Sequence, residues 1–386
     1  MNRREIYLDN AATTRMDSRV VQAMFPHLTE QYGNPSSIHE LGEQARQAVE
    51  HAREVIAGKI HALPEEIIFT GSATEADNLA IKGIAYKHKG RGRHIITTKI
   101  EHKAVLESCS YLETDGFRVT YLDVDSEGKV SLEQLKKAIK KDTILVSICH
   151  ANNEIGVLQD ITAIGNICRK AGVYFHTDAA QSFTKVPLDV GSMKIDLMTL
   201  SGHKIHGPKG VGALYVRKGV ALCPLLHGGE QEFSLRAGTE NVAAIVGFAK
   251  AGELASQKDV QNMEKLRDYF IAELLKIPHV TLNGSAHDRL CNNINVCFEA
   301  IDAETMLQHL SSKCISASAG SACTAGRIEP SHVLKALGLS DAAANSSVRF
   351  SLSKYTTKEE LMYAVQQIKE IVAGLAVINI VIINKV

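Results

Sequence analysis

The chain has 386 residues, of which 45% are hydrophobic and 22% charged, and its 43 basic and 43 acidic side chains give a formal net charge of zero. This composition is typical of a globular protein of two or three domains, and the balanced charge argues against a nucleic-acid-binding protein. The N-terminal residues lack the apolar core of a signal peptide, and the eight cysteines form no CxxC pair. We therefore expect free thiols in a reducing cytoplasm, rather than a disulfide framework or a zinc ribbon.

From about Glu66 to Val216 the pattern alternates between short apolar runs and helical stretches such as Glu75–His88 and Leu132–Lys140. The alternation predicts an α/β fold with a mostly parallel seven-stranded sheet and helices on both faces. Its strands are predicted at Ile67–Thr70, His94–Lys99, Val119–Leu122, Ile144–Cys149, Val173–Asp178, Leu197–Leu200 and Gly212–Val216.

The pattern changes after about Asp259. A long helix at Val260–Leu275 leads to short strands around Val280–Leu282 and Asn293–Phe298, which predicts a smaller α+β domain. The tail Val377–Ile383 is almost entirely β-branched. It is too short to span a membrane, so we expect a final strand or an adhesive end.

Two polar side chains follow neighbouring predicted strands. Asp178 ends the run that begins at Val173, and Lys204 follows Leu197–Leu200 in the run Ser-Gly-His-Lys. Ligands of an α/β sheet bind beyond the carboxyl ends of its strands. Pyridoxal phosphate (PLP) requires a lysine there to form a Schiff base, and an acid to keep its pyridine nitrogen protonated. Burial would favour the neutral amine that this chemistry needs, whereas a solvated lysine is the ordinary alternative.

A turn of small residues, Gly71–Glu75, follows the first strand and opens a helix. Backbone N–H groups and the helix dipole favour an anion there, such as a phosphate, although an ordinary helix cap is the commoner use of such a turn. Thr74 could add a hydroxyl donor. Ser201 and His203 flank Lys204 and could also reach a phosphate.

Three further polar residues follow strands. His102 could stack on a pyridine ring and transfer protons, although most histidines are structural. Asn153, in the run Asn152–Gly156, could bind a cofactor oxygen or a substrate carboxylate, but asparagines are also common in turns. Gln181 lies one helical turn after Asp178 if a helix begins there, and it could bond the phenolic oxygen of the cofactor.

Two residues late in the chain carry the remaining chemistry. Cys323 lies in a stretch of small residues, Ser316–Gly326, which predicts an exposed, mobile loop with an accessible thiol. Arg349 lies in an alternating strand, Val348–Leu352, where a buried guanidinium needs an anion. A substrate carboxylate and a structural salt bridge are both open as its partner.

In combination these motifs resemble the cysteine desulfurases of the NifS/IscS type, which are PLP enzymes of fold type I. The resemblance covers nearly the whole chain. It rests on Tyr7–Thr14, Tyr32–Ser37 with His39, Gly71–Asn78, Glu101-His102, Asn152–Gly156, His176–Gln181, Ser201–Lys204, Arg236–Asn241 and the Cys323 loop. It implies a large PLP-binding domain at 14–258. It also implies a small domain made of 1–13 and 259–386 that carries the loop with the catalytic cysteine.

The resemblance also implies a role for each candidate residue. Lys204 would hold PLP covalently, Asp178 would hold its ring nitrogen, His102 would stack on the ring and Cys323 would form the persulfide. The phosphate would be bound by Ala73, Thr74, Ser201 and His203, with Thr239 reaching it across a homodimer interface. Gln181 would contact the phenolic oxygen, and Asn153 and Arg349 would hold the carboxylate of L-cysteine. A sulfur-acceptor protein such as an iron–sulfur scaffold is the implied partner, although the apolar tail differs from the tails that dock such scaffolds. No metal, nucleic acid or membrane is implied.

Other functions remain open at this stage. A PLP aminotransferase would need Lys204 and Asp178 but not Cys323, and a selenocysteine lyase would share all three. A sulfur-handling scaffold or metal-binding protein is a third reading, given eight cysteines and 16 histidines. The scattered cysteines and the absence of an HExxH motif argue against that third reading.

Overall fold

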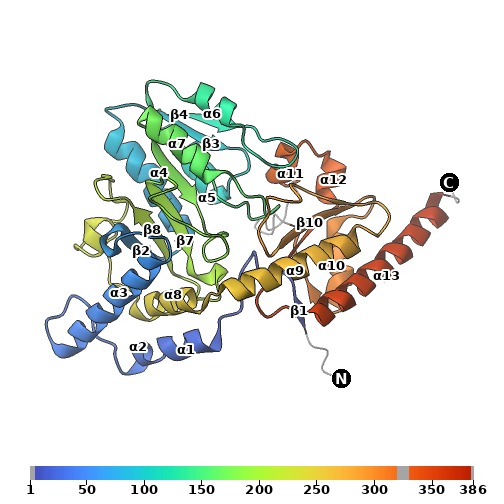
Figure 1. The fold of residues 1–386 in the computed structure, drawn as a ribbon, viewed down its shortest axis with the longest axis horizontal. Helices are drawn as coiled ribbons and strands as arrows, with labels where there is room; N and C mark the ends of the chain where they lie inside the picture. The colour runs from blue at the N-terminus through green and yellow to red at the C-terminus, as the bar shows by residue number, and fades with distance from the viewer. Residues whose placement is uncertain (1–4, 320–329, 384–386) are drawn as a thin grey trace.

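The structure, a computed structural model, describes residues 5–319 and 330–383 (Figure 1). A seven-stranded sheet with the order β2-β8-β7-β6-β5-β3-β4 forms the centre of the larger part. The strands are β2 (Ile67–Thr70), β3 (His94–Thr98), β4 (Arg118–Leu122), β5 (Thr143–Ser147), β6 (Tyr174–Asp178), β7 (Leu197–Ser201) and β8 (Gly212–Val216). Within this sheet β8 runs antiparallel to both neighbours. The predicted mostly parallel α/β sheet is therefore confirmed.

Apart from the edge strand β4, the sheet is largely buried, and apolar side chains lie on both of its faces. Successive residues of a strand point to opposite faces. Ile96 and Val146 belong to one core, and Ile95 and Leu145 to the other. The first core includes side chains of α3 (Glu40–Gly58), α6 (Leu132–Ala138), α7 (Ile161–Ala171) and α8 (Val242–Leu254). The second includes side chains of α4 (Ala73–His88) and α5 (Lys103–Thr114).

A second, smaller group of elements packs around a core of its own, which includes Phe270, Phe298 and Phe350. Its antiparallel sheet has the order β12-β10-β9, and β1 pairs in parallel with β11. Ile6 and Leu8 belong to this core, so the N-terminal segment packs with the C-terminal part of the chain. The elements are β1 (Ile6–Tyr7), α9 (Gln257–Leu274), β9 (Val280–Leu282), β10 (Asn293–Phe298), α10 (Ala303–Ser312), β11 (Ile315–Ser316), β12 (Ser347–Ser351) and α13 (Lys358–Ile383).

The remaining helices are short. They are α1 (Ser18–Met24), α2 (Pro26–Thr29), α11 (His332–Ala336) and α12 (Asp341–Asn345).

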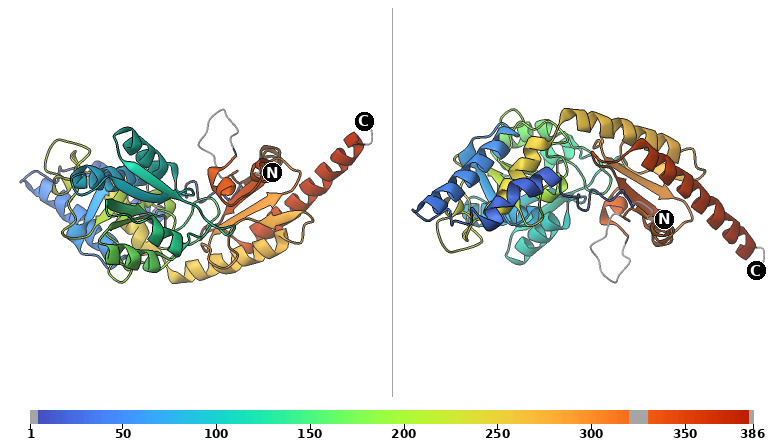
Figure 2. Two further views of the ribbon diagram at one scale, coloured as in Figure 1. Left: turned by 90° about the horizontal axis from the view of Figure 1, so that it is seen from above. Right: turned by 90° about the horizontal axis from the view of Figure 1, so that it is seen from below.

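The prediction of a final strand at Val377–Ile383 is wrong. Helix α13 continues to Ile383, and its C-terminal end extends away from the rest of the molecule (Figures 1 and 2). A helix that is already nucleated gains one hydrogen bond for each residue it adds, and β-branched residues are only slightly worse helix formers than others. Among the described residues, no helix is both long enough and apolar enough to cross a membrane.

Gly212 allows β8 to lie close to the turn that precedes α4. It pairs with Thr70 on one side and with Ser201 on the other. A Cβ atom at this position would lie 2.7 Å from the carbonyl carbon of Ser72 and 2.8 Å from the nitrogen of Ala73. The absence of a side chain here therefore sets how near the turn lies to the ends of β2 and β7.

We expect Gly212→Ala to lower the free energy of unfolding by about 1–3 kcal/mol, because the backbone of the turn must move to relieve the overlap. Gly58→Ala is the matched control, since a Cβ there would have nothing within 4 Å. That control should be neutral, or stabilising by about 0.5–1 kcal/mol. Chemical denaturation measures both variants, and equal stability of the two would contradict the close approach.

Candidate active site

A cavity of about 310 Å³ lies at the carboxyl ends of the parallel strands. It brings together ten of the candidate residues: Ala73, Thr74, His102, Asn153, Asp178, Gln181, Ser201, His203, Lys204 and Arg349. Thr239 is exposed and does not line this cavity. Cys323 lies outside the described residues. Residues from two distant parts of the chain, the strand ends and β12, therefore face one space.

The turn before α4 is both a helix cap and a wall of the cavity. Ser72 is the N-cap, and its hydroxyl accepts a hydrogen bond from the backbone N–H of Glu75. The Glu75 carboxylate accepts from the N–H of Gly71 and pairs with Arg236 at 2.8 Å. Ala73 and Thr74 line the cavity. The positive end of a 16-residue helix thus borders the cavity, which favours an anion there.

Ser201 adds an unsatisfied donor to the same wall. It is 1% exposed, and its hydroxyl oxygen has no hydrogen-bond partner among the described residues. Next to it, Nδ1 of His203 lies 3.1 Å from the hydroxyl of Thr13, and burial lowers the pKa of His203 to about 4. A buried hydroxyl without a partner is costly, so this position is suited to a ligand with acceptor oxygens.

Lys204 follows β7 in a single 3₁₀ turn, Gly202–Lys204. Its amine donates to the carbonyl oxygens of Ala11 at 2.6 Å and Ala12 at 2.8 Å. Burial, then the charges of Arg349 and Lys185, lower the pKa of Lys204 to about 8. The rival lysine of the same run, Lys209, is exposed and does not line the cavity.

Two buried carboxyl groups line the same cavity as Lys204. Asp178 ends β6, and its Oδ1 accepts from the backbone N–H of Ala180 at 2.8 Å. Burial raises the pKa of Asp178, while His102, the N–H of Ala180 and Lys204 oppose the rise. Asp77 also lines the cavity, is 1% exposed, and lies 3.7 Å from Nε2 of His176. Burial, and then the charge of Asp178, raise the pKa of Asp77.

His102 has a defined tautomer. It is the N-cap of α5, and its Nδ1 accepts from the backbone N–H of Ala104 at 3.1 Å. Burial lowers its pKa, so the ring is neutral at neutral pH and its proton is on Nε2. A histidine in this state can donate through Nε2 without losing its cap.

Gln181 is placed differently from the expectation of a helix after Asp178. The residues that follow Asp178 form turns, and the Gln181 amide nitrogen donates to the carbonyl oxygen of Ala11 at 2.9 Å. The amide therefore helps to hold the N-terminal segment against the large sheet, and the side chain also borders the cavity.

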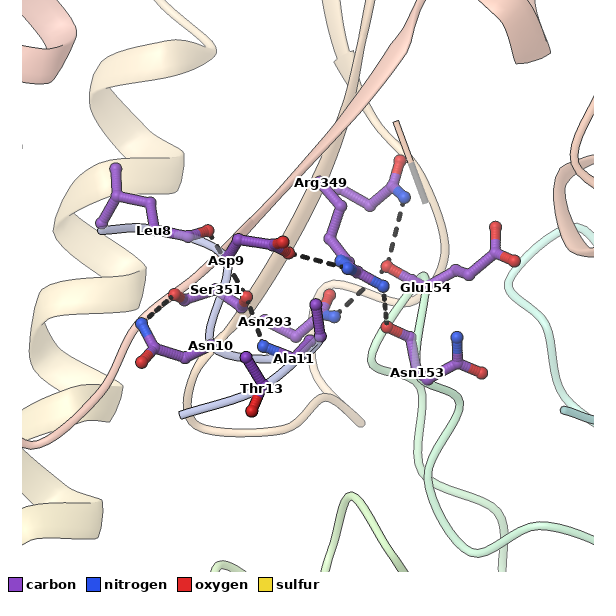
Figure 3. A network of polar contacts seen from close by, with 12 residues as sticks. Leu8, Asp9, Asn10, Ala11, Thr13, Asn153, Glu154, Asn293, Arg349 and Ser351 are labelled. Carbon is purple, nitrogen blue, oxygen red and sulfur yellow. Dashed lines mark hydrogen bonds and ion pairs between the residues drawn. The ribbon is translucent and has the colours of Figure 1, made fainter. Parts of the chain in front are cut away.

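Arg349 joins the two parts of the chain (Figure 3). Its side chain is 3% exposed, Nη1 donates to the carbonyl oxygen of Asn153 at 3.0 Å, and Nη2 donates to Oδ1 of Asp9 at 2.9 Å. The strand around it is buried on both faces, rather than alternating. A salt bridge is therefore present, and the guanidinium still borders the cavity.

Asp9 and Asp77 were not among the predicted site residues, although both lie in the motifs that carry the resemblance. An acidic side chain next to small residues was the feature of the sequence that could have pointed to each of them. The carbonyl oxygens that hold Lys204 gave no signal, because every residue has one. Among the residues that the structure describes, no group of histidine, cysteine and acidic side chains could hold a metal ion.

Comparisons with known proteins agree with this geometry. The model of the class-V aminotransferase family matches residues 6–363. The chain belongs to the class-V aminotransferase family. It is 50% identical to the cysteine desulfurase IscS of Dictyoglomus turgidum over 98% of this chain and 97% of that protein. The corresponding protein of Methanosarcina thermophila is 51% identical over 96% of this chain and 92% of its own length.

Solved structures of class-V aminotransferase relatives have the same fold. A NifS-like protein has a TM-score of 0.90 and 41% identity, and the match covers 96% of this chain and all of that one. SspA in complex with cysteine has a TM-score of 0.83 and 42% identity, over 91% of this chain and all of that one. The predicted resemblance to NifS/IscS enzymes and the fold-type-I architecture are therefore confirmed.

The lowered pKa of Lys204 predicts its reactivity. In PLP-free protein the fraction of neutral amine should rise through pH 8, so acetylation of Lys204 should increase most between about pH 7 and 9, whereas an ordinary lysine has a pKa of about 10.4. Arg349→Leu should move this midpoint upward, since the charge of Arg349 lowers the pKa. Mass spectrometry of peptides after a brief pulse of acetic anhydride measures the rate, with the exposed Lys209 as reference. A Lys204 rate that follows Lys209 at every pH would contradict the assignment.

Proposed function

We infer that this protein is a cysteine desulfurase that uses PLP to convert L-cysteine to L-alanine and leaves the sulfur as a persulfide on Cys323. One observation carries the proposal: the Lys204 amine, the Asp178 carboxylate and the Arg349 guanidinium border a single cavity. The relatives named above, which match almost end to end, are cysteine desulfurases, and one similar structure contains cysteine. The cavity and these relatives favour the same chemistry.

The cavity suits PLP on three counts. The unpartnered hydroxyl of Ser201 and the N-terminal turn of α4 would bind its phosphate. Asp178, the acid at the end of β6, would hold the ring nitrogen in its protonated form. Lys204 has an amine with a pKa of about 8, so a useful fraction is neutral and able to attach to an aldehyde. Gln181, His102 and Asn153 line the remaining wall.

When bound, PLP supplies an electron sink for the bond that changes at the substrate Cα. Lys204 would hold the cofactor covalently, and its free amine would take the substrate Cα proton on Nζ. The carbonyl oxygens of Ala11 and Ala12 would receive the released amine, since it donates to them in the structure. His102 would transfer the proton of the substrate thiol at Nε2, the nitrogen that its cap leaves free.

Transfer of the substrate sulfur to Cys323 would need no added oxidant, because the electrons of the broken C–S bond stay with the carbon. The thiolate of Cys323 attacks the substrate sulfur, because the thiolate is the nucleophilic form. The S–S bond forms, the C–S bond breaks, and its electron pair stays with the carbon, which is reprotonated to give L-alanine. One cysteine and one enzyme thiol thus yield one alanine and one persulfide.

The chain on either side of the stretch 320–329 is attached beside the cavity. Ser318 pairs with Arg349 through both backbone hydrogen bonds, and Ser331 donates to the carboxylate of Glu154, the residue after Asn153. Cys323 is five residues from Ser318 in the sequence. This attachment supports Cys323 as the thiol that collects the sulfur.

The closest alternative is an aminotransferase, since the whole family carries that name. It would use Lys204 and Asp178 in the same way, but it would form a keto acid and would not need Cys323. A selenocysteine lyase would share all three residues, and comparing selenocysteine with cysteine as substrate separates it. The near-complete match to cysteine desulfurases favours the desulfurase over both.

The proposal includes two protein partners and a compartment. A homodimer would bring the partner's Thr239 to the phosphate, which agrees with the exposure of Thr239 in a single chain. A sulfur-acceptor protein, such as an iron–sulfur scaffold, would take the persulfide sulfur. The proposed compartment is the cytoplasm, and the seven cysteines in the described parts of the chain are free thiols.

Two substitutions separate the roles of Lys204 and Cys323. Lys204→Ala should abolish both the formation of alanine and the near-visible absorbance of covalently held PLP. Cys323→Ser should keep that absorbance and reduce alanine formation from L-cysteine by at least about 100-fold, because a neutral hydroxyl is a poor nucleophile. Absorbance spectra and an alanine assay measure the two effects. Normal sulfide release by Cys323→Ser would show that this residue is not the nucleophile.

Mixing variants tests the shared site. A Thr239→Ala chain lacks the hydroxyl that its partner needs, and a Lys204→Ala chain lacks the amine of its own site. In a mixed dimer, one of the two sites is complete. It has the intact Lys204 of the Thr239→Ala chain and the intact Thr239 of the Lys204→Ala chain. Alanine formation at limiting PLP should therefore rise above that of either variant alone. It should reach about half of the wild-type rate for mixed dimers alone, and about a quarter for a random equimolar mixture, in which about half of the dimers are mixed. Unchanged activity in a mixture shown by mass to contain mixed dimers would contradict the shared site.

A further inference from the structure

Asp9 lies behind the guanidinium of Arg349, outside the cavity wall. It is not one of the cavity-lining residues, and its side chain is 19% exposed. Its Oδ1 accepts from Nη2 of Arg349 at 2.9 Å (Figure 3). The pair joins the N-terminal segment to β12, which are 340 positions apart in the chain.

The contacts of Arg349 use only part of its hydrogen-bonding capacity. A guanidinium has five N–H groups. One is taken by Asp9 and one by the carbonyl oxygen of Asn153, while the buried Nε has no partner among the described residues. Donors therefore remain for a second carboxylate, and a guanidinium binds carboxylates best in a fixed, forked geometry.

The backbone around Asp9 is held in place on both sides. Asp9 forms a parallel bridge with Ser351, and the carbonyl oxygen of Leu8 accepts from the backbone N–H of Ser351 at 2.6 Å. The side-chain amide of Asn10 donates to the carbonyl oxygen of Ser351 at 2.8 Å. The carboxylate of Asp9 is thus anchored by the same strand that carries Arg349, and it can fix the orientation of the guanidinium.

The other contact of Arg349 is fixed in the same way. The carbonyl oxygen of Glu154 accepts from the amides of Asn293 and Asn295, and that of Ile155 accepts from Arg289 at 2.7 Å. The segment that offers the Asn153 carbonyl to Arg349 is therefore tied to β10 and to the loop before it. Both groups that hold Arg349 are rigidly supported.

We propose that Asp9 is a positioning residue for the carboxylate of the substrate. It holds Arg349 in one orientation and offsets the charge of that buried cation, so that the remaining N–H groups are ready for an α-carboxylate when the amino acid enters. Without Asp9 the guanidinium loses a charge-assisted bond and gains rotational freedom, which the substrate must then overcome. This inference rests on the proposed function, and it goes beyond it by giving a role to a residue that does not touch the substrate.

The test compares L-cysteine with cysteamine, which is the same molecule without the carboxylate. Binding is measured in the PLP-loaded Cys323→Ser protein, from the change in cofactor absorbance on adding each compound. Asp9→Ala should weaken binding of L-cysteine by about tenfold, the usual scale for one charge-assisted hydrogen bond, and should leave cysteamine within about twofold. Asp9→Asn, whose amide oxygen can still accept from Nη2, should restore L-cysteine binding to within about threefold.

Controls separate positioning from general loss of structure. In an Arg349→Ala background, Asp9→Ala should cause no further loss of L-cysteine binding, because the group it positions is absent. Asp17→Ala removes another buried carboxylate, which is paired with Arg19 and Lys354. It should lower the melting temperature without changing the ratio of L-cysteine to cysteamine affinity.

Either of two binding results would overturn the proposal. In one, Asp9→Ala weakens L-cysteine and cysteamine equally, which would place its effect on the fold or on Lys204. In the other, Asp9→Ala leaves both affinities unchanged. If Asp9→Ala does not fold, the double variant with Arg349→Ala should fold and bind cysteamine, since it buries no unpaired cation; failure of the double variant to fold would also refute the idea. Wild-type protein that forms no alanine would instead refute the proposed function.

Discussion

The amine of Lys204 donates to the carbonyl oxygens of Ala11 and Ala12, and this contact ties the N-terminal segment to the large sheet. The same segment continues back to Asp9, which holds Arg349 of the small sheet. The four residues Asp9–Ala12 thus contact both Lys204, the residue proposed to hold the cofactor, and Arg349, the residue proposed to hold the substrate carboxylate. This N-terminal segment is part of the site, because it contacts both side chains and so helps to set the distance between Lys204 and Arg349.

The charges in the cavity oppose one another, and burial decides the outcome for each. Lys204 and Arg349 repel, which adds to desolvation in lowering the pKa of Lys204. On the acidic side, Asp77 and Asp178 repel, and Asp77 has fewer groups that favour its anion. Burial raises the pKa of Asp178, and the N–H of Ala180 and the charge of Lys204 oppose that rise. An amine with a lowered pKa and a buried acid therefore border the same cavity, which is the pair of groups that PLP chemistry uses.

Much of this arrangement could be predicted from the sequence, because the carboxyl ends of parallel strands meet at one edge of a sheet. Asp178, Lys204, His102 and Asn153 were each found as a polar residue after an apolar run, and all four border the cavity. Contacts made by backbone atoms could not be found in this way. Neither could the reversed direction of β8, since an apolar run does not reveal which way a strand runs. The tail was misread as a strand because β-branched residues favour strands only where a sheet is available, and here a helix already leads into them.

Arg349 shows why the two readings of a buried arginine need not exclude each other. If the guanidinium were fully satisfied by Asp9, it would form only a structural salt bridge. If it had no partner until a substrate bound, it would be a buried, unpaired cation, which is costly. Here a carboxylate and a carbonyl oxygen satisfy part of the group, and Arg349 still borders the cavity. The partial satisfaction reduces the cost of burial and leaves donors available for a substrate. Such a site can bind a carboxylate reversibly, since the arginine stays paired when the substrate leaves.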